Sequence, residues 1–180
     1  TITGTGTSSL SGTIALGADS TFNGTGALTL SGVISGSTFG ITKSGTGSVI
    51  LSAANTYTGA TTISTGTLTA SNANALGTTA GGTTIASAGT LEINGVAIGA
   101  EGITLNGGTL TGTGTGSLSG AIAMGANSTV NGTGSLTLSG IISGSSFSLS
   151  KAGTGTLTLS GANTFSGGLS ILAGTVSGTT

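Results

Sequence analysis

The chain repeats itself almost letter for letter. Residues 1–72 return as residues 109–180 without a gap, at an offset of 108 positions, and the changes are mild, such as Ile2 for Leu110. Near-identical tandem copies are typical of stacked proteins, in which each unit buries its apolar face against its neighbours. We therefore predict a single solenoid segment over residues 1–180, with one full repeat at 1–108 and a partial repeat at 109–180. We expect it to be an excerpt of a longer repetitive protein.

The local pattern is that of strands and corners. Apolar residues alternate with Thr or Ser in Leu28-Thr29-Leu30-Ser31, Ile103-Thr104-Leu105 and Leu157-Thr158-Leu159. This period of two places one set of side chains inside and the other outside a strand. Gly, Asn and Ser between the strands favour tight corners. Helix-forming Glu, Lys, Gln and Arg are almost absent, so we predict an all-β fold.

The spacing of the strands indicates how they are arranged. LTLSG at 28–32 is followed by VILSA at 49–53, and LTLSG at 136–140 by LTLSG at 157–161, so both copies show the same step of 21 positions. Steps of this size predict a parallel β-solenoid with roughly 20 residues per coil. A β-sandwich also has short strands with Gly turns and stays open as an alternative. Its core normally needs more aromatic residues than the 3% found here.

Charge and composition exclude several function classes. Only 3% of the residues are charged, and the two cations, Lys43 and Lys151, cannot form the basic stripe that nucleic acids or anionic membranes require. No apolar run approaches the ~20 residues of a membrane span. The absence of cysteine excludes disulfides and thiolate ligands. We expect partners to be neighbouring repeats of the same chain, with homotypic association as a further option.

One motif occurs in both copies. The later copy runs from Lys151-Ala152-Gly153-Thr154-Gly155 through Ala162-Asn163-Thr164-Phe165 to Ala173-Gly174-Thr175-Val176. The earlier copy has Lys43, Gly45 and Gly47, then Ala54-Asn55-Thr56-Tyr57 and Gly66-Thr67-Leu68. This motif resembles the autotransporter-associated β-strand repeat, also called the passenger-associated transport repeat. Related segments cover nearly the whole chain.

The resemblance implies a fold and a role. Members of this family occur in bacterial type V secreted passengers and in very large surface proteins. The resemblance therefore implies a right-handed parallel β-helix, a location at the bacterial cell surface or outside the cell, and a role as rod, stalk or adhesin shaft. It also implies help for export, with folding outside the cell driving one-way passage. The family motif contains no catalytic residue.

Catalytic chemistry finds little support among the residues. The acids are Asp19, Glu92 and Glu101, Asp19 becomes Asn127 in the second copy, and histidine is absent. Each acid is predicted to be a solvated surface charge, since charged side chains normally stay outside. Lys43 and Lys151 are predicted to be solubilising residues on corners. We therefore predict no enzyme activity, no catalytic or metal-binding residues and no cofactor.

The remaining candidates are structural or weak. Asn55 and Asn163 occupy matching corners, where a side-chain hydrogen bond to the turn backbone is expected. Tyr57 and Phe165 are predicted to pack over a corner or fill a core slot. Three asparagines match the N-glycosylation acceptor pattern, a cheap match in a chain so rich in Asn and Thr: Asn23, Asn127 and Asn131.

Three alternatives to a stalk stay open. Low charge and unpaired solenoid ends also suit a self-associating extracellular filament or sheath. A carbohydrate-binding β-helix is another alternative. Thr-x-Thr triplets, such as Thr67-Leu68-Thr69, suit an ice-binding face only where they recur on every coil, and Ser-Val-Ile and Leu-Glu-Ile interrupt the series.

Overall fold

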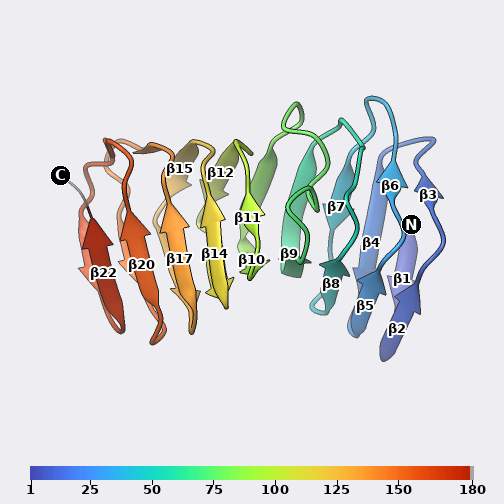
Figure 1. The fold of residues 1–180 in the computed structure, drawn as a ribbon, viewed down its shortest axis with the longest axis horizontal. Coiled ribbons are helices and arrows are strands. Elements are labelled where there is room, and N and C mark those ends of the chain that lie inside the picture. Colours follow the sequence, from blue (N-terminus) through green and yellow to red (C-terminus); the bar gives the residue numbers. More distant parts are fainter. Residues whose placement is uncertain (179–180) are drawn as a thin grey trace.

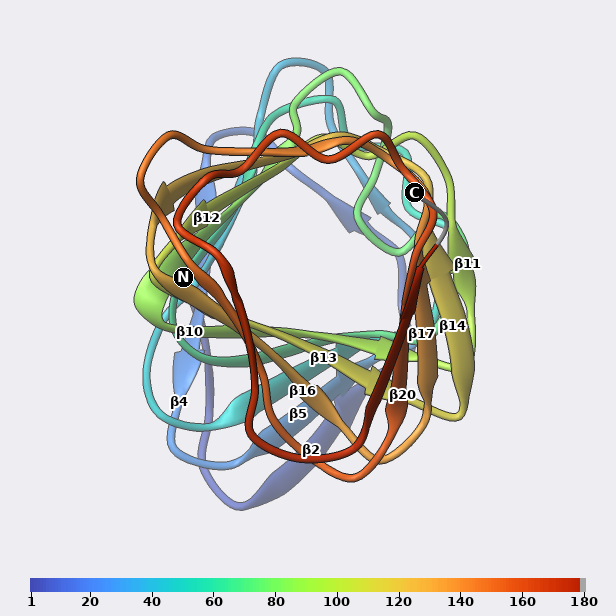
Figure 2. The same ribbon diagram turned by 90° about the vertical axis from the view of Figure 1, so that its left-hand side faces the viewer.

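The chain winds into a rod of stacked coils. The computed structural model describes residues 1–178, and its regular elements are 22 strands, with no helix among them. The longest ladder passes through nine coils, and the first and last strands, β1 and β22, lie at opposite ends of the rod (Figure 1). Seen from the C-terminal end, the chain turns counter-clockwise as it approaches the viewer (Figure 2). The winding is therefore right-handed, the usual hand for parallel strand connections.

Each coil has three sides, called here the first, second and third side in chain order. The first side consists of β1 (Ile2–Gly4), β4 (Ser20–Gly24), β7 (Ile41–Lys43), the opening part of β9 (Thr61–Ala70), the opening part of β10 (Thr83–Asn94), β12 (Ile103–Asn106), β15 (Ile122–Ala126) and β18 (Ile142–Ser143). The second side consists of β2 (Thr7–Leu10), β5 (Ala27–Leu30), β8 (Ser48–Leu51), the closing parts of β9 and β10, β13 (Thr109–Thr113), β16 (Ser128–Gly132), β19 (Leu149–Lys151) and β21 (Leu169–Ile171).

The third side is the least regular. Near the N-terminus it holds only the short pair β3 (Ile14–Ala15) and β6 (Ile34–Ser35). Towards the C-terminus it becomes a five-stranded sheet of β11 (Ala97–Ile98), β14 (Thr115–Leu118), β17 (Ser135–Leu138), β20 (Thr156–Leu159) and β22 (Thr175–Gly178).

All pairings between these strands are parallel, which confirms the solenoid and excludes the antiparallel layers of a sandwich. The register advances by one coil at each pairing. Ile2 pairs with Phe22, Ile63 with Ile85 and Leu105 with Met124, which are steps of 20, 22 and 19 positions. The predicted length of a coil is therefore correct. The length differs from coil to coil because the corners between the strands differ in length.

The core is a set of vertical columns of like side chains. Alternation sends every second residue inward, so each inward position stacks on its counterpart in the next coil. One such column on the second side is entirely aliphatic over six coils: Leu28, Val49, Leu68, Leu91, Leu110 and Val130. These side chains are at most 5% exposed, so burial of small apolar groups stabilises every coil junction.

The two copies of the repeated sequence lie on different sides of the rod. Strand β14 repeats the sequence of β2, yet β2 belongs to the second side and β14 to the third. Figure 2 shows the same shift, with β2 and β5 below and β14 and β17 on the right. The first-side column that starts at Ile2 reaches Leu105 after five coils, so residue 110, the copy of residue 2, lies one side further on. The second copy is thus rotated by about a third of a turn.

Candidate functional site: two lysine-capped corners

Lys43 lies inside the rod, in a column that is otherwise apolar. Its in-register partners on β4 and β9 are Phe22 and Ile63. The side chain is only 1% exposed. Its aliphatic stem therefore occupies a core position, as long charged side chains can when their head group finds polar partners.

The ammonium group of Lys43 finds its partners in the backbone. Nζ donates hydrogen bonds to the carbonyl oxygens of Ser44 (2.9 Å), Gly45 (2.7 Å) and Thr65 (3.0 Å). Three acceptors match the three N–H donors of an ammonium group. Burial lowers the pKa of Lys43, because removal from water disfavours the charged form. The lysine thus ties the corner of its own coil to the corner of the next.

Lys151 repeats this arrangement one side further round the rod. Its Nζ donates to the carbonyl oxygens of Ala152 (2.8 Å), Gly153 (2.8 Å) and Ala173 (3.3 Å), and the side chain is 2% exposed. Burial lowers the pKa of this ammonium group too. The prediction that both lysines are solubilising surface residues is therefore wrong. The alternation of the strand places both lysines inward. The backbone carbonyls of the corner accept their hydrogen bonds, and the sequence pattern does not indicate these acceptors.

A glycine completes each lysine-capped corner. Gly66 has a φ of 73°, and Gly174 has the same value, a backbone conformation that favours glycine. A Cβ at Gly66 would stand 2.7 Å from the Lys43 ammonium, and one at Gly174 would stand 2.8 Å from that of Lys151. The lysine and the glycine of the following coil are therefore one structural unit.

The matching asparagines bind successive coils together. The backbone N–H of Ile34 donates to Asn55 Oδ1 at 2.8 Å, and Asn55 Nδ2 donates to the carbonyl of Ala75 at 2.6 Å. In the second copy Ile142 N–H donates to Asn163 Oδ1, also at 2.8 Å. The predicted role in backbone hydrogen bonding is confirmed, with partners in neighbouring coils.

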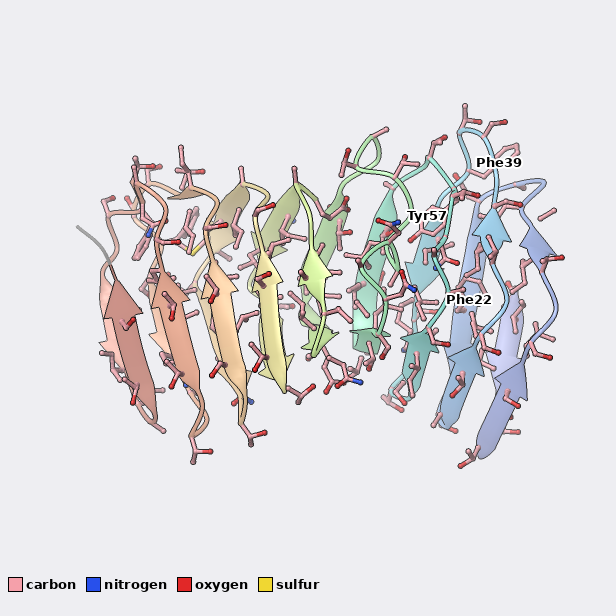
Figure 3. The ribbon with its side chains drawn as sticks, in the orientation of Figure 1. Phe22, Phe39 and Tyr57 are labelled. Carbon is pink, nitrogen blue, oxygen red and sulfur yellow. The ribbon has the colours of Figure 1, made fainter. Side chains whose placement is uncertain are left out.

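The aromatic side chains fill the core more fully in the first copy. Tyr57 is completely buried, whereas Phe165, its counterpart in the last coils, is half-buried. Figure 3 labels Phe22, Phe39 and Tyr57, all in the coils of the first copy. The predicted packing role holds for both residues, since Tyr57 belongs to the core and Phe165 packs against it.

The three acids take up different environments and do not form a pair. Asp19 is exposed on a corner, where Oδ1 accepts the N–H of Gly40 at 2.9 Å. Glu92 points outward and accepts the hydroxyls of Thr69 (2.8 Å) and Thr113 (2.9 Å). These two agree with the prediction of outward-facing charges.

Glu101 contradicts that prediction, because its side chain is only 3% exposed. Its Oε1 accepts the hydroxyl of Thr83 at 2.7 Å. The residue precedes β12, outside any alternating segment, so the sequence pattern carried no signal for its direction. The signal that could have indicated its burial is Thr83, an inward-facing threonine whose hydroxyl needs a buried hydrogen-bond partner.

The structure offers little for catalysis or metal binding. A depression of about 320 Å³ beside Asp19 has no second acid in its lining, which otherwise consists of Thr38, Gly40, Ile41, Thr42, Ala60 and Thr62. Among residues 1–178, no group of three or more His, Cys, Asp or Glu side chains could hold a metal ion. The same residues include no helix long and apolar enough to cross a membrane.

The glycosylation-pattern asparagines use their side-chain oxygens in local bonds. Asn23 Oδ1 accepts the N–H of Gly24, and Asn131 Oδ1 that of Gly132, both at 2.7 Å. Asn127 Oδ1 accepts the N–H of Ser148 at 2.9 Å, as Asp19 does for Gly40 in the first copy. These side chains therefore shape corners, and modification at them stays a prediction.

Comparison with known families identifies the repeated unit. Residues 41–70, 71–93 and 149–177 match the family described as Passenger-associated-transport-repeat. Three segments of the chain are therefore similar to passenger-associated transport repeats. No curated protein and no solved structure matches the chain.

The boundaries of two of these repeats coincide with the lysine-capped corners. The matches at 41–70 and 149–177 each begin two residues before the lysine and continue past the glycine that closes the corner, Gly66 or Gly174. One such repeat therefore spans a complete coil and continues into the next coil past the glycine beside the lysine ammonium group. The match at 71–93 has no lysine, but Gly89 pairs in register with Gly66.

Proposed function

We propose that this chain is a rigid, extracellular segment in the shaft of a bacterial surface protein, such as an adhesin or an autotransporter passenger. The repeats and the solenoid fit a structural repeat segment of an autotransporter passenger. They point to a structural role. The single observation that carries the proposal is the second-side ladder, which runs unbroken through nine coils.

The interior also favours rigidity. Within residues 1–178, every buried polar side-chain atom has a hydrogen-bond partner. Fully satisfied buried polar groups oppose local opening, because exposure gains them little. We expect the purified chain to resist proteases and to form straight particles in electron microscopy. Flexible or collapsed particles would contradict a shaft.

Help for export is the second part of the proposal, since a coil that folds on an already folded coil cannot easily slide back. The test is secretion of this segment through an autotransporter membrane domain, with wild type compared with Leu91→Asp, which places a charge in the core column. Reduced surface yield of the variant supports the role. Equal yield at early times would contradict it.

Self-association into filaments is the alternative structural function. Large apolar side chains are exposed at one equivalent position of the two copies along the rod, Val33 (36%) and Ile141 (48%). Exposed apolar side chains of this kind favour lateral contact between rods. Sedimentation over a hundredfold range of concentration tests this alternative, and a strictly monomeric chain would contradict it.

One observation favours a further candidate, an ice-binding face. On β14, β17, β20 and β22 both outward columns consist only of Ser and Thr: Thr115, Ser135, Thr156 and Thr175, and Ser117, Thr137, Thr158 and Ser177. The interruptions noted in the sequence lie on the second side, at Ser48-Val49-Ile50 and Leu91-Glu92-Ile93. A thermal-hysteresis measurement tests this candidate, and the absence of hysteresis would eliminate it.

A further inference from the structure

Two threonines interrupt an isoleucine column inside the rod. On the first side Ile41 is followed by Thr61 and Thr83, and then the column returns to Ile103 and Ile122. Thr61 is fully buried and Thr83 is 2% exposed. A buried hydroxyl costs free energy unless it is hydrogen-bonded, so each threonine requires a partner in the interior.

The partners come from two different segments. The Tyr57 hydroxyl lies 2.6 Å from Thr61 Oγ1, and Thr83 Oγ1 donates to Glu101 Oε1 at 2.7 Å. We call these four residues the Glu101 cluster. Its members are all at most 3% exposed; Thr61 and Thr83 are neighbours in register on β9 and β10, and the Thr83–Glu101 bond connects the coils that contain β10 and β12.

No cation balances the Glu101 carboxylate. The only lysines are Lys43 and Lys151, and each donates its three bonds to backbone carbonyls elsewhere. Asp19 and Glu92 face outward. Among the elements packed against Glu101, the one titratable group described is the Tyr57 phenol. An ionised carboxylate in such surroundings is costly, because no opposite charge compensates it and only 3% of the side chain is exposed to solvent.

The cluster spans the most irregular junction of the rod. The step from Ile63 to Ile85 is the longest on the first side, and the chain between β9 and β10 leaves the strands over residues 71–82. Figure 1 shows this segment as a loop that rises above the neighbouring coils. The strands on either side of this loop are nevertheless paired in register at nine positions, so the excursion lengthens the corner without interrupting the ladder.

We propose that Glu101 makes the junction between the coils of β10 and β12 a pH-sensitive element, which is firm when the carboxyl group is protonated and weakened when it ionises. The protonated form keeps the bond with Thr83 without burying a charge. The ionised form needs more hydrogen-bond donors than the Thr83 hydroxyl, and separation of the coils containing β10 and β12 at this corner admits the water that supplies them.

The direction of the pH dependence follows from the surroundings. Burial raises the pKa of Glu101, and the hydrogen bond from Thr83 offsets part of this effect. The folded state therefore holds its proton to higher pH than the unfolded chain does. Stability from this group is fully present below the unfolded pKa, about 4.3, and is lost as pH rises through the raised folded value.

The first test is urea unfolding between pH 4 and pH 8 for wild type, Glu101→Gln and Glu92→Gln. For each pH unit that separates the folded pKa from the unfolded one, the folding constant changes tenfold across this range. We expect the wild type and E92Q, in which an outward acid is changed, to lose stability together as pH rises. E101Q keeps the Thr83 bond and should lose that pH dependence. Parallel profiles for wild type and E101Q would overturn the proposal.

The second test reads the site directly. Tyr57 is the only tyrosine and there is no tryptophan, so intrinsic fluorescence of the whole chain reports on the Glu101 cluster. Burial, with the nearby Glu101 charge, raises the pKa of the Tyr57 phenol, which keeps it protonated between pH 4 and 8. Emission should change with pH in wild type and stay constant in E101Q. Emission that is constant in wild type as well would count against titration at this junction.

A third variant tests the proposal even if E101Q fails to fold. Thr83→Val removes the hydroxyl that stabilises the carboxylate but leaves Glu101 in place. We expect it to move the fluorescence transition to higher pH. A transition that stays where it is in wild type would show that Glu101 does not titrate in this cluster, and would overturn the proposal.

Discussion

The lysine-capped corners of the two copies share their chemistry and differ in their surroundings. Lys43 lies in a first-side column and Lys151 in a second-side column, yet both donate to the next two carbonyls and to one from the following coil. The corner geometry is therefore local and does not depend on which side of the rod it occupies. A rotation of about a third of a turn leaves it intact, because all three sides are parallel ladders with similar spacing.

A second comparison shows what the copies do not share. Tyr57 and Thr61 of the first copy become Phe165 and Leu169 in the second. Both members of the hydrogen-bonded pair change together to apolar residues. In the first copy both positions are fully buried, so a lone hydroxyl in either place would lack its partner there. In the second copy Phe165 is half-buried and Leu169 is exposed, so no buried pair is needed.

The largest effect is expected from Lys43→Met, which keeps the core stem but removes the ammonium group. Three partly buried carbonyls lose a donor, and the free energy of unfolding should fall by about 3 kcal/mol. Lys151→Met should cost less, because its bond to Ala173 is longer, at 3.3 Å. Urea denaturation of both variants at pH 7 provides the measurement. Equal losses would mean that the two corners contribute alike.

The next effect concerns the glycine that closes the corner. Gly66→Ala imposes a side chain at positive φ and crowds Lys43, so we expect a loss of about 2 kcal/mol. Gly17→Ala is the matched control, because a Cβ there meets no atom within 4 Å. Thermal unfolding measures the difference. A Gly66→Ala protein as stable as the control would show that the corner relaxes freely.

A double-mutant cycle tests the joint change of the polar pair. Tyr57→Phe alone should cost about 1 kcal/mol, and Thr61→Leu alone about 2 kcal/mol, because the first leaves a buried hydroxyl without its partner and the second also adds volume. The double variant reproduces the second copy and should cost less than the sum by about 1 kcal/mol or more. Strict additivity in equilibrium unfolding would contradict the coupling.

The smallest effect is expected at the corner acid. Asp19→Asn makes the first copy like the second, where Asn127 accepts a backbone N–H at the same distance of 2.9 Å. The acceptor is retained, so stability should change by less than about 0.5 kcal/mol. Asp19→Ala removes the acceptor and serves as the contrast. If Asp19→Asn lowered the free energy of unfolding as much as Asp19→Ala in urea, the charge of Asp19, and not its acceptor oxygen, would be the stabilising feature.

Much of this architecture could be predicted from sequence. Alternation in segments such as Leu28-Thr29-Leu30 determined which side chains point inward, and the regular return of such segments determined that strands stack as coils. The motif around Lys43 and Lys151 identified the family, and the corner role of Asn55 was also correct. These features are periodic or local, so they can be predicted from the spacing of residues in the sequence alone.

Only the tertiary structure decided how distant segments meet. The burial of Glu101 and of both lysines depends on hydroxyls and carbonyls that lie 18 or 22 positions away in sequence and one coil away in space. The rotation of the second copy depends on the sum of all corner lengths, because one sequence repeat makes five coils and part of a sixth. The number of residues in a repeat sets the rotation of the next copy about the rod axis only through the lengths of the coils, and each corner contributes to those lengths.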